Sequence, residues 1–142
     1  MFVGQYSHSV DTKGRLAIPA KFRGELKKAV VTKGLDNCLF LYPKKEWDKL
    51  AEKIANLPIS KSNTRAFSRL MLAGAMDVEV DKQGRVVLPE YLRKFAGLKK
   101  KTIITGLYNR LEVWDEDMWN KYNTENEKNS VENAEALDGL GV

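Results

Sequence analysis

The chain contains the same sequence unit twice, and this duplication constrains its fold more than any other feature. Residues 10–19 read VDTKGRLAIP and residues 80–89 read VDKQGRVVLP, at an offset of 70. The match continues outside this segment, at an offset of 70 and then 72, through the pairs Phe2/Leu72, Gly4/Gly74, Phe22/Leu92, Arg23/Arg93, Gly34/Gly106 and Trp47/Trp119. A register held over so much of the chain indicates one structural unit used twice.

The repeat divides the chain into four parts. We assign residues 1–58 to the first copy, 59–74 to a helical bridge, 75–122 to the second copy and 123–142 to an acidic polar tail. Each copy is short for an independent hydrophobic core. We therefore expect the two copies to share one core or to depend on oligomerisation.

Charge is distributed unevenly along the chain. Residues 1–70 carry 14 Lys and Arg against 6 Asp and Glu, whereas residues 123–142 carry 1 against 5. A basic first half favours an anionic partner, although a generally basic surface would have the same composition. The chain shows no signal peptide, no membrane span and a single cysteine, Cys38, so we expect a soluble cytoplasmic protein without a disulfide or cysteine-based metal cluster.

Two Asp-x-x-Gly segments, 11–14 and 81–84, have the composition of β-turns. Aspartate at the first position accepts hydrogen bonds from the following backbone N–H groups, and glycine at the fourth tolerates positive φ. Apolar residues alternate on both sides of the second turn, as in strands, at Val78, Val80, Val86 and Leu88. Each turn is therefore expected at the tip of a β-hairpin.

Each turn is followed by the same predicted series of elements. Pro19 and Pro89 suit the first turns of short helices at about 19–24 and 89–96, which Gly24 and Gly97 would end. A second hairpin follows in each copy, with strands at 29–32 and 38–42 in the first, and at 101–105 and 111–114 in the second.

A helix is expected at the end of each copy. Trp47, Leu50, Ala51 and Ile54 form one apolar stripe at helical spacing. Residues 65–73 read as a bridging helix and residues 115–122 as the helix of the second copy. The tail is expected to be flexible or a frayed extension of that last helix.

This order of elements resembles the SpoVT-AbrB family of swapped-hairpin barrels. Two copies in one chain, with residues 2–23 reading FVGQYSHSVDTKGRLAIPAKFR and residues 67–75 reading FSRLMLAGA, resemble the MraZ family within it. The resemblance reaches residue 122 and leaves the tail uncovered.

The resemblance implies an α+β, mainly β fold in which tandem swapped-hairpin units share a pseudo-symmetric barrel with flanking helices. It also implies head-to-tail assembly into rings that bind promoter direct repeats at the division and cell-wall gene cluster. The DNA contacts would come from the Asp-x-x-x-Arg turns, here Asp11 to Arg15 and Asp81 to Arg85. Lys13 stands in the first turn where Gln83 stands in the second, although Lys82 in place of Thr12 partly compensates, so the two turns need not bind DNA equally.

Arg15 and Arg85 are the strongest candidates for DNA contact. An arginine fork can bond O6 and N7 of guanine together, or grip a phosphate with two bonds. Each arginine could instead fold back onto its own turn aspartate, and both arrangements can hold at once. The remaining DNA-binding candidates are Asp11 and Asp81, which would orient the arginines, Lys13 and Lys82, which would meet phosphates, and the flanking Lys21 and Arg23.

The other reactive residue types have no companion residues with which to form a catalytic or metal site. His8 is the only histidine and is expected to have a structural role, Cys38 to be a small buried hydrophobe, and the tryptophans to belong to the core. No catalytic or phosphate-loop motif is present, so we expect neither an enzyme nor a cofactor.

The leading functional prediction is a sequence-specific transcription regulator that binds double-stranded DNA as a ring in the nucleoid. An oligomeric protein-interaction scaffold is the alternative. RNA binding is a weaker third reading, because single-strand readout needs exposed aromatic residues for stacking.

Overall fold

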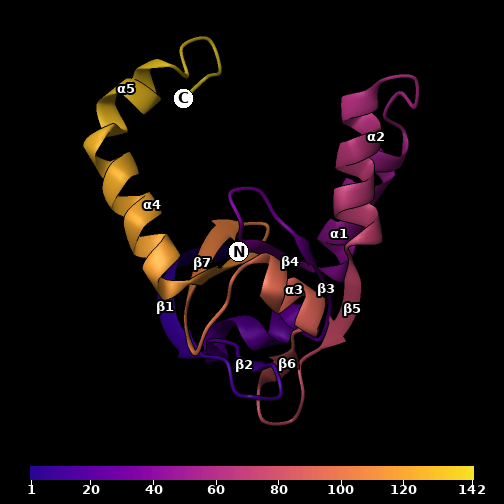
Figure 1. Ribbon diagram of the computed structural model, residues 1–142, viewed down its shortest axis with the longest axis vertical. Helices are drawn as coiled ribbons and strands as arrows, with labels where there is room; N and C mark the ends of the chain where they lie inside the picture. Colours follow the sequence, from indigo (N-terminus) through magenta and orange to yellow (C-terminus); the bar gives the residue numbers. More distant parts are fainter.

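The computed structural model covers residues 1–142 and combines an antiparallel six-stranded sheet, a two-stranded ribbon and two helical arms (Figure 1). The strands are β1 (Phe2–Ser9), β2 (Arg15–Ala17), β3 (Lys28–Lys33), β4 (Leu39–Pro43), β5 (Met76–Glu79), β6 (Arg85–Val87), β7 (Lys101–Tyr108) and β8 (Leu111–Asp115). The helices are η1 (Ala20–Leu26), α1 (Lys44–Ala55), α2 (Ser62–Ser68), η2 (Arg69–Ala73), α3 (Glu90–Phe95), α4 (Glu116–Lys128) and α5 (Ser130–Glu135). The expectation of a mainly β, α+β fold is confirmed.

The two copies exchange strands throughout. The large sheet has the order β1-β7-β8-β4-β3-β5, so the first strand of each copy pairs with the hairpin of the other copy. All eight residues of β1 pair along β7, and β5 pairs along β3. The ribbon likewise joins β2 of the first copy to β6 of the second. Neither copy holds a complete sheet by itself, which explains why each can be so short.

The core is shared, as expected. Its main cluster of 18 buried residues draws on both copies and includes Leu16, Ile18, Val86 and Leu88 on the inner face of the ribbon. A second cluster lies on the other face of the large sheet, where Trp47, Ile54 and Met71 from the α1, α2 and η2 region cover it. The stripe predicted for α1 is thereby confirmed.

The second hairpin of each copy is confirmed, but the first is largely replaced by exchange. Val10 forms one antiparallel bridge with Leu16 beyond its turn, and the rest of β1 pairs with β7. The reason is length, because an eight-residue strand finds a full-length partner in β7 and only three residues in β2. Strand β7 also runs on to Tyr108, which leaves a tighter connection to β8 than the sequence predicted.

Gly24, Gly97 and the end of α4 mark three helix boundaries that the sequence had predicted or left open. Gly24 lies inside η1 and does not end this helix, because its φ lies outside the left-handed region. Gly97 follows α3 at φ 60°, as a helix stop does. Helix α4 continues well beyond residue 122, and its N-cap Asp115 accepts a hydrogen bond from the Met118 N–H at 3.3 Å. The start of the tail is thus an extension of that helix.

The overall shape separates the turns from the helices. The α1–α2 arm and the α4–α5 arm rise at one end of the molecule, and the two Asp-x-x-Gly turns project at the opposite end (Figure 1). None of the helices combines the length and apolar character that crossing a membrane requires.

Candidate functional site

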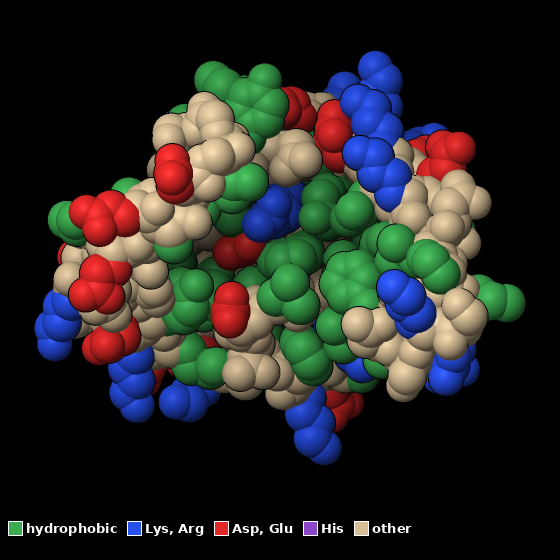
Figure 2. All heavy atoms as spheres, turned by 90° about the horizontal axis from the view of Figure 1, so that it is seen from above, with side chains coloured by type: hydrophobic (Ala, Val, Ile, Leu, Met, Phe, Trp, Pro, Cys, Tyr) green, Lys and Arg blue, Asp and Glu red, His purple; other side chains and the backbone are tan.

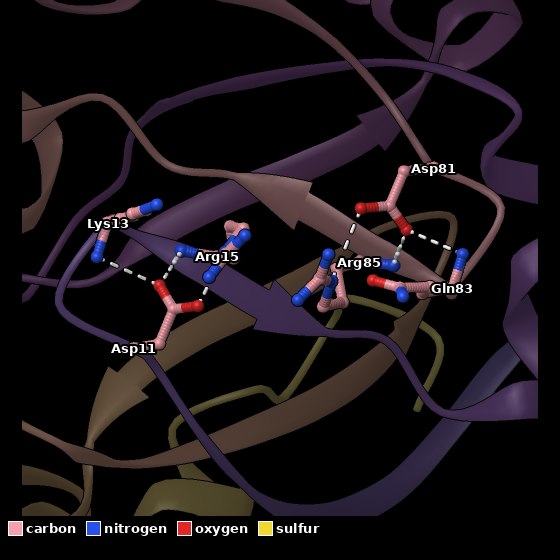
Figure 3. Close-up of polar contacts among 6 residues, drawn as sticks. All are labelled: Asp11, Lys13, Arg15, Asp81, Gln83 and Arg85. Atoms are coloured by element: carbon pink, nitrogen blue, oxygen red, sulfur yellow. Dashed lines mark hydrogen bonds and ion pairs between the residues drawn. The ribbon is translucent and has the colours of Figure 1, made fainter.

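The β2–β6 ribbon brings the two turns together. Arg15 pairs with Val87 and Ala17 with Arg85, so both arginines lie on one face of the ribbon. The alternate residues Leu16 and Val86 are fully buried on the other face. Period-two alternation in the strands therefore points both arginines away from the core. In Figure 3, the side chains of Arg15 and Arg85 lie in the middle, with Asp11 on one side and Asp81 on the other.

Each turn is closed by its own aspartate, as predicted. Asp11 Oδ1 accepts hydrogen bonds from the backbone N–H groups of Lys13 and Arg15, both at 2.9 Å, and Gly14 has φ 81°. The second turn repeats this pattern with Asp81, Gln83 and Arg85, again at 2.9 Å, and with Gly84 at φ 78° (Figure 3).

The aspartates also hold the arginine side chains. Asp11 Oδ2 lies 2.5 Å from Arg15 Nε, and Asp81 Oδ2 lies 3.3 Å from Arg85 Nε. The hydrogen bond from the Arg15 backbone lowers the pKa of Asp11, and the one from Arg85 does the same for the pKa of Asp81. Each arginine thus folds back onto its aspartate through Nε, while its two terminal nitrogens make no hydrogen bond within the chain.

Each turn is supported by the other copy. The Ile18 N–H donates to the Gly84 carbonyl at 2.9 Å, and the Leu88 N–H donates to the Gly14 carbonyl at 2.7 Å. Arg23 donates through Nε to the Ile18 carbonyl at 2.8 Å, and its guanidinium lies against Gly84. The structure therefore places Arg23, a predicted DNA contact, beside the turn of the second copy, with its guanidinium packed against Gly84.

Arg93 is a site residue that sequence reasoning missed. It is the repeat equivalent of Arg23, donates through Nε to the Leu88 carbonyl at 2.9 Å, and lies against Gly14. The pairing of Arg23 with Arg93 in the repeat was the available signal. Only the strand exchange shows that each of them reaches the opposite turn.

The lysines occupy different places around the ribbon. Lys13 and Lys82 are exposed on the turns without an ion pair, whereas Lys21 lies over the Tyr6 ring at 4.9 Å, away from the turn tips. Lys99 and Lys100 border a cleft of about 450 Å³ together with Asp11, Thr12 and Arg93. Their closeness to the first turn follows from the Val10 N–H, which donates to the Lys100 carbonyl at 2.8 Å.

The other residues singled out by the sequence, His8, Cys38 and the tryptophans, are buried or half-buried. His8 is half-buried, and burial followed by the charge of Arg23 lowers its pKa, which favours the neutral imidazole. Cys38 is fully buried, as predicted, and burial raises the pKa of its thiol. Trp47 and Trp114 are core residues, and Trp119 packs edge-on against Trp114 with ring centres 5.3 Å apart.

Known proteins similar to this chain agree with the repeat. The family model described as MraZ protein matches twice, over residues 1–70 and 71–140. A protein of Caldanaerobacter subterraneus subsp. tengcongensis named transcriptional regulator MraZ is 48% identical over 143 positions, covering all of both chains. Relatives of the same name from Halothermothrix orenii and Carboxydothermus hydrogenoformans are 48% and 54% identical, covering 100% and 86% of each chain. The chain belongs to the MraZ family.

Proposed function

We propose that this protein is a sequence-specific DNA-binding transcriptional regulator of the division and cell-wall gene cluster. It acts in the cytoplasm at the nucleoid, and binds promoter direct repeats as a ring-shaped homo-oligomer. The exchanged strands fit a pseudo-symmetric barrel of two swapped-hairpin units. The names of the relatives support the regulatory role.

The observation that carries the proposal is the pair of outward-facing arginines on the ribbon. Asp11 and Asp81 fix each guanidinium through Nε, and the terminal nitrogens remain available as donors. A fork of this kind matches the two acceptors of guanine in the major groove, which a two-stranded ribbon can enter. The aspartates therefore orient the readers, and the arginines read the bases.

The lysines supply affinity without sequence preference. Lys13 and Lys82 are placed to meet phosphates beside the turns, and Lys21 flanks the ribbon. Arg23 contributes by holding the second turn in place. Since Lys13 has Gln83 as its counterpart, and the first 70 residues are the basic part of the chain, the Asp11–Arg15 turn is the principal reader. Several weak turn contacts from neighbouring chains add through effective concentration on a repeated site.

A binding comparison separates this function from the scaffold alternative. Fluorescence anisotropy with a promoter duplex bearing direct repeats, and with a scrambled duplex of equal length, is expected to show clear preference for the repeats at moderate salt. Affinities for both duplexes must be compared at one salt concentration, because phosphate contacts weaken as salt rises. Equal affinity for the two duplexes would favour the scaffold.

Lys13→Ala is expected to weaken binding to all DNA sequences alike. Losing one phosphate contact lowers the slope of log affinity against log salt concentration by about 1. Gln83→Lys provides the matched comparison, because it adds the same charge to the other turn and should steepen that slope. A slope that does not change in Lys13→Ala argues against a phosphate contact at that position.

A further inference from the structure

The cleft beside the first turn carries positive charge that the turn itself does not use. It has a volume of about 450 Å³ and lies between the turn residues Asp11 and Thr12 and the segment 93–100. The one acidic residue in its lining, Asp11, is already paired with Arg15. The basic residues of the lining are Arg93, Lys99 and Lys100. We call this hollow the first-turn cleft.

The strand exchange fixes the lysine run 99–101 at the base of the first turn. Lys101 begins β7 opposite Ser9, the last residue of β1. The Val10 N–H donates to the Lys100 carbonyl at 2.8 Å, directly before the turn. Because these contacts are made by the backbone, the place of the run does not depend on the lysine side chains.

Arg93 is the positioned cation of the first-turn cleft. It is half-buried and donates through Nε to the Leu88 carbonyl at 2.9 Å, and its two terminal nitrogens make no hydrogen bond within the chain. A guanidinium held in this way presents its remaining N–H groups as a fork, which matches two oxygens of one phosphate. Arg93 is therefore ready to bind an anion from outside the chain.

Lys99 and Lys100 also lack strong partners within the chain. Both side chains are exposed, and Lys100 forms no ion pair. Lys99 Nζ lies 3.7 Å from Asp117 Oδ2, and the two side chains are 73% and 74% exposed. An ion pair so exposed contributes only about 0–1 kcal/mol, so it does not hold Lys99 away from a stronger anion.

The corresponding surface beside the second turn is less basic. Lys28 begins β3 opposite Glu79, in the way that Lys101 begins β7 opposite Ser9. The lysine run of the first copy, 27–28, is also one residue shorter than the run 99–101. One additional carboxylate and one fewer lysine lower the charge beside the second turn by two.

The end of the molecule opposite the turns offers no comparable cation in its hollow. Figure 2 looks onto that end and shows hydrophobic side chains around a hollow, with most Lys and Arg side chains toward the edge. The one basic residue that lines the hollow, Arg110, is paired with Glu112 at 2.9 Å. A polyanion therefore finds an unpaired arginine fork in the first-turn cleft and a paired one in the hollow between the arms.

We propose that the first-turn cleft binds a backbone phosphate of the DNA duplex whose major groove the ribbon enters. This inference rests on the proposed DNA-binding function and adds a contact outside the two turns. The major groove is about 12 Å wide and is bordered by both phosphate strands, so a ribbon inside it brings its flanks close to phosphates. The terminal nitrogens of Arg93 bind the phosphate oxygens, and Lys99 and Lys100 add charge at the rim.

Lys100→Ala tests the cleft, with Lys53→Ala as a control that removes the same charge from the exposed surface of α1. Lys100→Ala should weaken binding to the direct-repeat and scrambled duplexes by the same factor. It should also lower the slope of log affinity against log salt concentration by about 1, as one lost phosphate contact does. Lys53→Ala should change neither quantity. An unchanged slope in Lys100→Ala would overturn the proposal.

Arg93→Lys tests the fork, and its repeat equivalent Arg23→Lys is the matched control. Both changes keep the charge and remove an Nε bond to a backbone carbonyl. Arg93→Lys should lose more affinity for both duplexes, because lysine cannot place a planar fork on one phosphate. Circular dichroism melting compares the stability of the two variants. Equal losses of affinity in two folded variants would overturn the role of Arg93.

Acetylation of lysines distinguishes DNA from other sources of phosphate. When either duplex is bound to the wild-type protein, Lys99 and Lys100 should react more slowly with an N-hydroxysuccinimide ester, as measured by peptide mass spectrometry. Lys53 should react at its usual rate. Inorganic phosphate, at the same concentration of phosphate groups, should protect none of them. Equal protection by inorganic phosphate would assign the cleft to a free anion and overturn the proposal, as would the absence of protection by DNA.

The same measurements separate this inference from the regulatory function. Protection of Lys100 by both duplexes, in a protein that shows no preference for the direct repeats, would support the phosphate contact and refute the sequence-specific function. Preference for the repeats with an unchanged salt slope in Lys100→Ala would do the reverse.

Discussion

The Arg15→Ala, Arg85→Ala double variant is expected to lose specific binding to direct-repeat DNA while it remains folded. Each arginine that reads a base contributes about 1–3 kcal/mol, so the double variant should lose most of its discrimination between repeats and scrambled DNA. The fold should persist, because each arginine pairs with its aspartate at a partly exposed site, where ion pairs contribute about 0–1 kcal/mol. Anisotropy titrations against both duplexes, with circular dichroism melting, measure the two effects.

The single variants should not be equal. Arg15→Ala should have the larger effect, because its turn belongs to the basic first 70 residues of the chain and its guanidinium is held at 2.5 Å, against 3.3 Å in the second turn. Arg69→Ala removes the same charge from the exposed surface of the α2–η2 region, at the opposite end of the molecule, and serves as control. Specific binding that survives in the folded double variant would refute the assignment of these turns.

The sequence predicted the local structure of the site well, because short-range chemistry determines it. Asp11 and Gly14, with their equivalents Asp81 and Gly84, specify turns closed by hydrogen bonds within five residues. The second hairpins were predicted for the same reason, since their strands are close in sequence and form continuous apolar runs, which the structure buries on both faces.

What the sequence did not predict depends on contacts between the copies. Strand β1 could have paired with β2 across its own turn, and no local signal favours β7 instead. The roles of Arg23 and Arg93 follow from that exchange, because each lies beside a turn about 60 to 80 residues away in sequence.

Gly14→Ala is expected to destabilise the protein strongly through the contact between copies. Gly14 has φ 81°, and the left-handed region costs an L-residue about 1–2 kcal/mol. A Cβ at this position would also lie 2.6 Å from the Leu88 carbonyl oxygen and 2.8 Å from Arg93 Nε. Crowding of this kind adds about 1–3 kcal/mol, and the backbone at Leu88 cannot withdraw without losing the Leu88 N–H bond to Gly14.

Two other glycine substitutions make this prediction specific to the exchanged contact. Gly84→Ala has the same left-handed backbone cost, at φ 78°, but the atoms nearest its Cβ belong to the Arg23 side chain, which can move away at the cost of its bond to Ile18, so its loss of stability should be smaller. Gly24→Ala has open space around its Cβ and an ordinary φ, and should leave stability unchanged or raise it by about 0.4–1 kcal/mol. Denaturant unfolding followed by tryptophan fluorescence, at equal protein concentration, ranks the three variants. A Gly14→Ala variant as stable as Gly24→Ala would show that the first turn does not depend on its contacts with Leu88 and Arg93. It would refute the inferred structural link between the two turns.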